Sequence, residues 1–178
     1  MNSRLLGILC MIGGVAVIIG ALVWGEFANT PGIIAGILWA LGSIAGLVGL
    51  IQLGALGDSP LSRALGFVPI IGFGLIAVGS VLHLAGIVDD QSTFFGVGWA
   101  VQMAGMLLVG ILTIAARRWR GWRRFVPLLT IVMVPVFFAL SRLNIPGFAV
   151  VFYGTYILLG YAVATAEPTP AAERPLAA

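Results

Sequence analysis

Few side chains in this sequence could do chemistry within or beside a membrane. His83 is the only histidine in the sequence, and Ser80 precedes it by three residues. Histidine can ligate haem or a pigment, or it can lie at a water-touched interface as an ordinary polar residue. The Ser80 and His83 spacing fits no catalytic signature. We therefore expect His83 to be an interfacial, partly buried polar residue, with ligand binding as the alternative.

Gln102 is a second candidate, because it lies in the middle of a long apolar stretch. Such a glutamine can hydrogen-bond to a neighbouring helix or contact a bound solute, and we expect the first role. No acidic or basic residue lies near the middle of any apolar stretch, which disfavours ion-coupled transport. Hydroxyl groups that could line a polar crevice beside two later stretches belong to Thr130, Tyr153, Thr155 and Tyr156.

The segment RRWRGWRR, residues 117–124, contains five of the nine basic residues. Mixed arginine and tryptophan can bind nucleic acid through phosphate contacts and stacking. Beside a bilayer, tryptophan prefers headgroup depth and each arginine gains about 1 kcal/mol from anionic lipid. We predict contact with anionic headgroups, no nucleic acid, and docking of a cytoplasmic partner as the alternative. The predicted lipid-interface residues are Arg117, Arg118, Trp119, Arg120, Trp122, Arg123 and Arg124.

The overall composition is typical of an integral membrane protein. Hydrophobic residues make up 61% of the chain and charged residues 8%. A soluble fold of this length could not bury that much apolar surface, so lipid must solvate it. The single cysteine, Cys10, excludes an intramolecular disulfide. We predict an all-α fold in which helices position the candidate residues.

Six apolar stretches are long enough to cross roughly 30 Å of hydrocarbon. We expect the first to be a retained helix, because its apolar run is longer than that of a signal peptide and no A-x-A site follows. Pro69, Pro127 and Pro135 should kink the third and fifth helices by removing backbone hydrogen bonds. The stretches cover residues 5–25, 31–55, 64–87, 93–116, 125–142 and 146–165.

The arginines predict the orientation of this six-helix topology. Arg142 falls on one side, and the other eight arginines fall on the opposite side. The positive-inside rule therefore places both termini in the cytoplasm. Since the chain uses arginine and never lysine, its composition suggests a GC-rich bacterial genome and hence the bacterial inner membrane.

An internal repeat organises the chain. Residues 3–14, SRLLGILCMIGG, resemble residues 62–73, SRALGFVPIIGF, with seven identities over 18 positions of the longer alignment. Trp39 and Trp99 match in the same way, 60 residues apart. Self-similarity at a fixed period indicates repeated structural units. We predict three tandem helical hairpins in one domain, residues 1–165, with units of about 1–60, 61–120 and 121–165 and a disordered tail at 166–178.

The third unit keeps only part of this pattern. Its turn NIPG, residues 144–147, copies NTPG, residues 29–32, and Asp89-Asp90 occupies the equivalent place in the middle unit. Asn or Asp before a returning helix is a good N-cap, and proline fits the first helical turn. The first helix of the third unit, FVPLLTIVMVPVFF, lacks the glycines of the other two.

Small residues recur every four positions in two of the predicted helices. One stripe contains Gly32, Gly36 and Ala40, and the other contains Gly96, Ala100 and Ala104. Such stripes let another backbone approach closely in lipid. We expect them to pack within the bundle, with self-association as the alternative.

Three segments share a pattern with a known family: SRLLG, the run NTPGIIAGILWALGSIAGLVGL, and SRALGFVPIIGFG. In these segments the chain resembles the HdeD-like acid-resistance membrane proteins, small six-span bacterial proteins built from a tandem repeat. The resemblance implies an inner-membrane, stress-linked role and assigns no catalytic or binding residue.

Taken together, these features predict a non-enzymatic inner-membrane protein without a cofactor or metal. The chain contains no phosphate-binding loop after a strand, no CxxC motif and no metal-ligand cluster. Two other functions remain open: an accessory subunit of a larger membrane complex, and a small-solute transporter or channel in which Gln102 lines the path.

Overall fold

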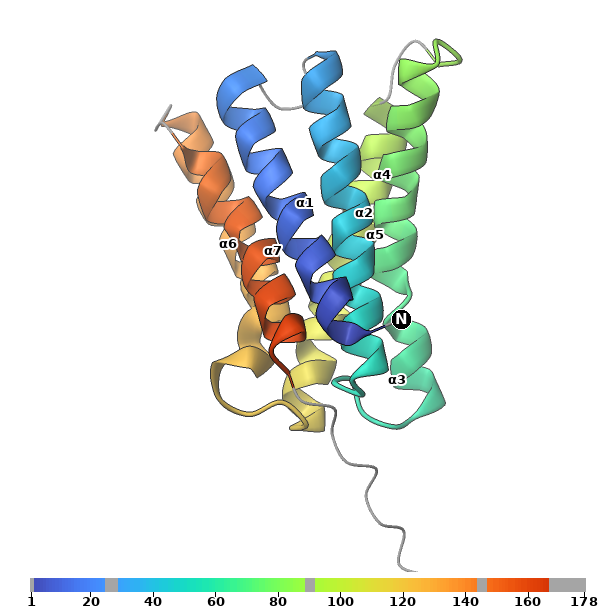
Figure 1. Ribbon diagram of the computed structural model, residues 1–178, viewed down its shortest axis with the longest axis vertical. Helices are drawn as coiled ribbons and strands as arrows, with labels where there is room; N and C mark the ends of the chain where they lie inside the picture. The colour runs from blue at the N-terminus through green and yellow to red at the C-terminus, as the bar shows by residue number, and fades with distance from the viewer. Residues whose placement is uncertain (1, 25–28, 89–91, 144–146, 167–178) are drawn as a thin grey trace, which may run out of the picture.

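The computed structural model describes residues 2–24, 29–88, 92–143 and 147–166, and within these ranges the chain forms helices and no strand. Figure 1 shows the long helices side by side along one axis, with the N-terminus and the end of the last helix at the same end. The elements are α1 (Ser3–Trp24), α2 (Thr30–Gln52), α3 (Pro60–Leu65), α4 (Val68–Leu84), α5 (Ser92–Ala116), the 3₁₀ helix η1 (Gly121–Phe125), α6 (Val126–Arg142) and α7 (Phe148–Ala164).

The long helices have the composition of membrane spans. α7 is also apolar, but at 17 residues it is shorter than the five long segments named at the end of this paragraph. Large side chains such as Ile12 and Leu22, more than half exposed, cover the outside of the bundle, as expected where lipid is the solvent. The chain is therefore an all-helical protein with the features of a multi-pass membrane protein. Five segments are long and apolar enough to cross a membrane: Ser3–Trp24, Thr30–Gln52, Pro60–Leu84, Thr93–Ala116 and Gly121–Arg142.

Within the described ranges, side-chain caps begin α2 and α3. Asn29 accepts a hydrogen bond from the backbone N–H of Gly32 at 3.0 Å, so the predicted N-cap of α2 is confirmed. The amide of Asn29 also donates to the carbonyl of Trp24, which joins the end of α1 to the start of α2. Ser59 caps α3 in the same way by accepting from Ser62. Asp89, Asp90 and Asn144 lie outside the described residues.

The three prolines lie at different points of their helices. Pro69 and Pro127 lie in the first turns of α4 and α6, where a missing N–H breaks no helical bond. The third apolar stretch is instead divided before Pro69, into α3 and α4. Only Pro135 lies inside a helix among the described residues. The predicted disruption of the third stretch therefore occurs as a break at Pro69, four residues after α3 ends at Leu65. Pro127 lies at the start of α6, so the prediction that it kinks the fifth helix is wrong.

The helices pack in chain order and close into a ring, because α7 returns to contact α1. Glycines allow the closest approaches. A Cβ atom on Gly42 would lie 2.7 Å from the carbonyl oxygen of Leu9, and one on Gly160 would lie 2.5 Å from that of Gly7. Real Cβ atoms essentially never come so close, so no other residue fits at either position without movement.

The two small-residue stripes face different surroundings. On α2, Gly32, Gly36 and Ala40 are buried inside the bundle, as expected for internal packing. On α5, Ala100 and Ala104 are exposed, and a Cβ atom at Gly96 would meet nothing. The inward face of α5 is formed by other residues, and the predicted α5 stripe lies on the outer surface.

Replacing Gly72 with alanine should destabilise the bundle. A Cβ atom there would lie 2.6 Å from the carbonyl oxygen of Gly98 and 2.7 Å from the Cα atom of Gln102, so α4 and α5 must separate. We expect Gly72→Ala to lower the unfolding free energy by about 1–3 kcal/mol, measured by thermal or denaturant unfolding in detergent. Gly74→Ala is the control, because its Cβ atom would meet nothing within 4 Å. Equal stability of the two variants would contradict the packing described here.

Candidate functional site

The polar residue at the centre of the bundle is Gln102. It lies roughly 15 Å from the start of α5, at ~1.5 Å per residue, and its side chain is fully buried. The Nε2 group of Gln102 donates a hydrogen bond to the hydroxyl of Tyr156 at 2.6 Å. This bond joins α5 to α7 across the interior, in the interhelical role expected from the sequence.

Aromatic rings from three other positions surround this pair. The ring of Trp39 lies 5.2 Å from Phe73, 5.2 Å from Tyr153 and 5.4 Å from Tyr156, each nearly perpendicular. Edge-to-face contacts of this kind add roughly 0.5–1.5 kcal/mol beyond the area that the rings bury. Four helices, α2, α4, α5 and α7, therefore meet in one group. We call Trp39, Phe73, Gln102, Tyr153 and Tyr156 the central cluster.

Several buried polar atoms of the bundle have no hydrogen-bond partner within the described protein. Within the cluster they are the indole nitrogen of Trp39, a donor, and the carbonyl oxygen of the Gln102 side chain, an acceptor. The hydroxyls of Ser43, on α2, and Thr130, on α6, are also buried without a hydrogen-bond partner. A buried polar group without a partner costs about 1–3 kcal/mol. These groups can hydrogen-bond to water or to a small polar molecule.

The four hydroxyl residues singled out in the sequence are all buried, but they do not form one lining. Tyr153 and Tyr156 belong to the central cluster. Thr155 donates to the carbonyl of Phe152 in its own helix at 2.7 Å, so its hydroxyl proton is already used. Sequence reasoning missed Trp39 as a site residue and used it only to align the repeat. A large aromatic residue within a glycine-rich helix was the signal available.

His83 lies at the far end of α4 from the arginine-rich segment. Its ring is half-buried, and Nδ1 lies 3.2 Å from the carbonyl oxygen of Val88. This contact is local, between a helix end and the turn that follows it. Among the described residues, no group of three or more His, Cys, Asp or Glu side chains could hold a metal ion.

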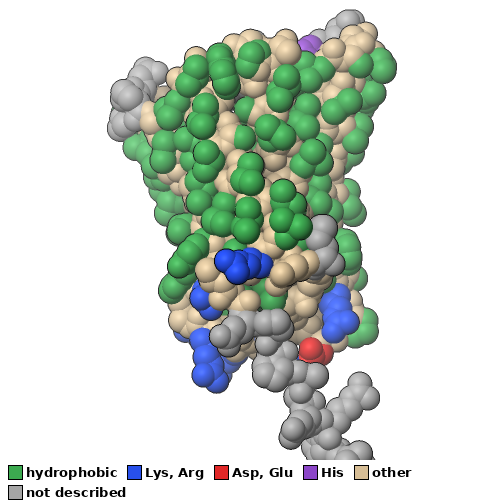
Figure 2. All heavy atoms as spheres, in the orientation of Figure 1, with side chains coloured by type: hydrophobic (Ala, Val, Ile, Leu, Met, Phe, Trp, Pro, Cys, Tyr) green, Lys and Arg blue, Asp and Glu red, His purple; other side chains and the backbone are tan. Residues whose placement is uncertain are grey.

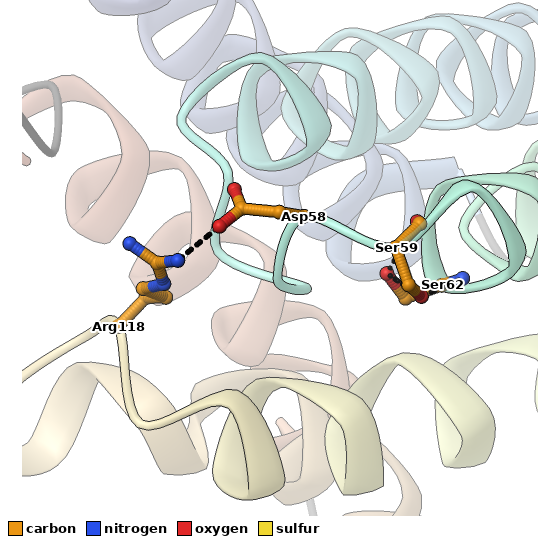
Figure 3. A network of polar contacts seen from close by, with 4 residues as sticks. All are labelled: Asp58, Ser59, Ser62 and Arg118. Atoms are coloured by element: carbon orange, nitrogen blue, oxygen red, sulfur yellow. Dashed lines mark hydrogen bonds and ion pairs between the residues drawn. The ribbon is translucent and has the colours of Figure 1, made fainter. Parts of the chain in front are cut away.

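The segment 117–124 connects α5 to α6 and is tied to the rest of the bundle by two of its arginines. Arg118 pairs with Asp58 in the connection between α2 and α3 (Figure 3). Arg123 donates to the hydroxyl of Thr165, just after α7, at 3.1 Å. The Arg118–Asp58 pair is solvent-exposed, with Asp58 68% exposed, so it should add less than about 1 kcal/mol to stability. The main effect of the Arg118–Asp58 pair is therefore to hold the segment 117–124 near the connection between α2 and α3.

The two tryptophans of the segment have different environments. Trp122 is 48% exposed and stacks on Tyr161 with ring centroids 6.2 Å apart, as suits a headgroup-level side chain. Trp119 is only 5% exposed and belongs to the hydrophobic core. The prediction that Trp119 lies at the lipid interface is wrong, because its large ring is buried against the bundle instead of facing lipid.

Charge is strongly segregated along the bundle. Figure 2 shows arginine side chains gathered at one end and apolar side chains over the rest of the visible face. Arg4, Arg63 and the arginines of 117–124 belong to elements that meet at this end, whereas Arg142 ends α6 at the opposite one. Arg117, Arg120 and Arg4 are exposed there. The arrangement presents a cationic surface at a single end of the described bundle.

Comparisons with known proteins gave no match: no family model, curated protein or solved structure matches the chain. The chemistry open to the site follows from its own side chains. The central cluster consists of aromatic, hydroxyl and amide groups and holds no ionisable acid or base of ordinary pKa near neutrality. Such a group suits neutral polar molecules, and the cationic end suits phosphate-bearing lipid.

The Gln102–Tyr156 bond should be measurable as a coupling between the two side chains. The measurement is a double-mutant cycle of unfolding free energies in detergent. We expect the double variant Gln102→Leu/Tyr156→Phe to lose less unfolding free energy than the two single variants lose in sum, by about 0.5–1.7 kcal/mol. Thr155→Val serves as the control partner, because its hydroxyl bonds within its own helix. Additive effects of Gln102→Leu and Tyr156→Phe would show that the bond contributes nothing.

Proposed function

We propose that this protein is a non-enzymatic, multi-pass protein of the bacterial cytoplasmic membrane that acts by engaging anionic lipid of the cytoplasmic leaflet. The observation that carries the proposal is the gathering of arginines at one end of an otherwise apolar bundle, beside the exposed ring of Trp122. Anionic headgroups are the binding partner that this combination fits best. The resemblance to HdeD-like proteins adds a stress-linked role to the proposal.

The proposal takes α7 as a sixth span and both termini as cytoplasmic. Seventeen residues of α7 extend ~26 Å, within the range of membrane-spanning helices. The start of α1 and the end of α7 lie at the arginine-rich end, as a positive-inside orientation requires (Figure 1).

The proposal also includes three repeated hairpins, of which the first two have equivalent contacts. A Cβ atom on Gly13 would meet the carbonyl of Leu38, and one on Gly72, 59 positions later, would meet that of Gly98. Gly13 also lies close to Gly42 in the first hairpin. At the equivalent positions of the second hairpin, Gly72 lies close to Gln102. The repeat alignment pairs these positions, so both the glycine contacts and the sequence support duplication.

Lipid engagement predicts enrichment of anionic lipid around the protein. The full chain should be reconstituted into mixed phosphatidylglycerol and phosphatidylcholine vesicles of equal acyl composition, extracted with its surrounding lipid, and the lipids quantified. We expect phosphatidylglycerol to be enriched, and the enrichment to fall at ~1 M salt, where the Debye length is about 3 Å. A variant with all five arginines of 117–124 replaced by glutamine should lose it. Arg142→Gln, at the opposite end, is the control, and equal lipid ratios for every variant would refute the proposal.

A second candidate function is passage of a small neutral solute through the bundle. The observation that favours it is the set of unpartnered donor and acceptor atoms buried inside the bundle on α2, α5 and α6. Transient hydrogen bonds from these atoms could replace those that a solute loses on leaving water.

This candidate predicts permeation that depends on Gln102. In light-scattering assays with glycerol as the probe, proteoliposomes should swell faster than protein-free vesicles. Gln102→Leu should return the rate to that of protein-free vesicles, because it removes the side-chain amide, with its donor and its acceptor, from the cluster. Thr155→Val should leave the rate unchanged. Wild-type protein that gives no faster swelling than empty vesicles would exclude glycerol passage.

A further inference from the structure

An apolar groove opens on the side of the bundle at its arginine-rich end. It has a volume of about 360 Å³ and runs between α6 and α7, with Trp122 and Phe125 at one end and Val132 at the other. Its remaining lining includes Leu129 and Leu158, so the described wall carries no charge. Trp122, Val132 and Leu158 are each more than two-fifths exposed, so the groove faces the surrounding lipid.

The sequence of α6 explains why the groove exists. α6, VPLLTIVMVPVFFALSR, contains no glycine, whereas close backbone contacts through glycine join α1 to α2, α1 to α7 and α4 to α5. A Cβ atom on Gly154 of α7 would meet nothing within 4 Å. Bulky side chains therefore hold α6 away from α7, and α6 belongs to the least buried of the five long apolar segments.

The guanidinium group of Arg124 lies beside an aromatic residue of this groove. The guanidinium carbon of Arg124 lies 4.6 Å from the centroid of the Phe125 ring, which lines the groove. The Nε atom of Arg124 is buried and has no hydrogen-bond partner in the described protein. Arg123 already donates to Thr165, and Arg118 pairs with Asp58, whereas no described acidic group is paired with Arg124.

We propose that the groove is a binding site for one anionic phospholipid, with an acyl chain between α6 and α7 and the phosphate on Arg124. The proposal rests on lipid engagement by the cationic end and specifies where one lipid binds. Charge complementarity selects this occupant, because a guanidinium forms paired hydrogen bonds with phosphate and the wall below it accepts only apolar groups. The groove and Arg124 thus match the two halves of a phospholipid.

Lipid titration of the full-length chain in detergent, read by native mass spectrometry, tests the site. The probes are phosphatidylglycerol and phosphatidylcholine with identical acyl chains. We expect wild-type protein to retain one phosphatidylglycerol about tenfold more tightly than phosphatidylcholine, the size of one charge-assisted contact. Arg124→Gln should reduce this preference to near unity. Arg63→Gln, an exposed arginine on α3 at the same end, should preserve it.

Filling the groove tests the acyl-chain half of the site. Val132→Trp should weaken binding of both lipids, because the added ring occupies the groove. Leu38→Trp is the matched control: Leu38 lines a similar apolar groove of about 380 Å³ between α1 and α2. That groove includes Trp24 and Pro31, so it lies toward the end of the bundle opposite the arginine-rich segment. Both positions are about half exposed, so both variants should fold, which thermal unfolding checks.

Three results would overturn this assignment. One is equal retention of the two lipids by wild-type protein, and another is an unchanged preference in Arg124→Gln. The third is a wild-type dimer that Val132→Trp dissociates without any reduction in lipid binding. A second copy of the chain would then be the occupant of the groove. If the variant lacking all five arginines loses anionic-lipid enrichment while Arg124→Gln keeps the preference, the groove site fails and the broader lipid proposal stands.

Discussion

Close contact between helix backbones at glycine is the constraint on which the rest of this structure depends. In lipid, burying apolar side chains gives helices little reason to associate, so van der Waals packing has to hold them together. Gly42 against α1, Gly160 against α1 and Gly72 against α5 provide that packing in three helix pairs. Their positions determine which faces of α1, α2 and α4 point inward and therefore which side chains reach the centre.

The central cluster follows from this packing. Because Gly72 lets α4 approach the backbone of Gln102, the amide is enclosed and bonds to Tyr156, while Trp39 packs over the same phenol. The α6–α7 groove has the opposite cause, a lack of glycine at the contact. Where glycine is missing from α6, the helices stay apart and leave an apolar surface beside Arg124. The interior cluster and the outer groove are therefore two outcomes of one packing rule.

Much of the helical framework could be predicted, since the length and apolarity of a stretch depend on local sequence alone. The cap at Asn29 is also local, because it acts within one helical turn. Pro127 and Trp119 were misjudged for a shared reason. A proline kinks a helix only if the helix has already begun, and a tryptophan contacts headgroups only if no neighbouring helix covers it. Both conditions depend on where adjacent segments start and how they pack.

By itself, the sequence determined that this chain is helical, apolar along its sides and cationic in one connecting segment, because these properties follow from composition and short-range spacing. It also marked Gln102 as the polar residue of a long apolar stretch. Only the tertiary structure decided that Gln102 meets Tyr156, that Trp39 joins them, and that Arg124 stands at a groove. These contacts join residues from different helices, and the physical reason is that helix rotation and separation are set by mutual packing of the whole bundle.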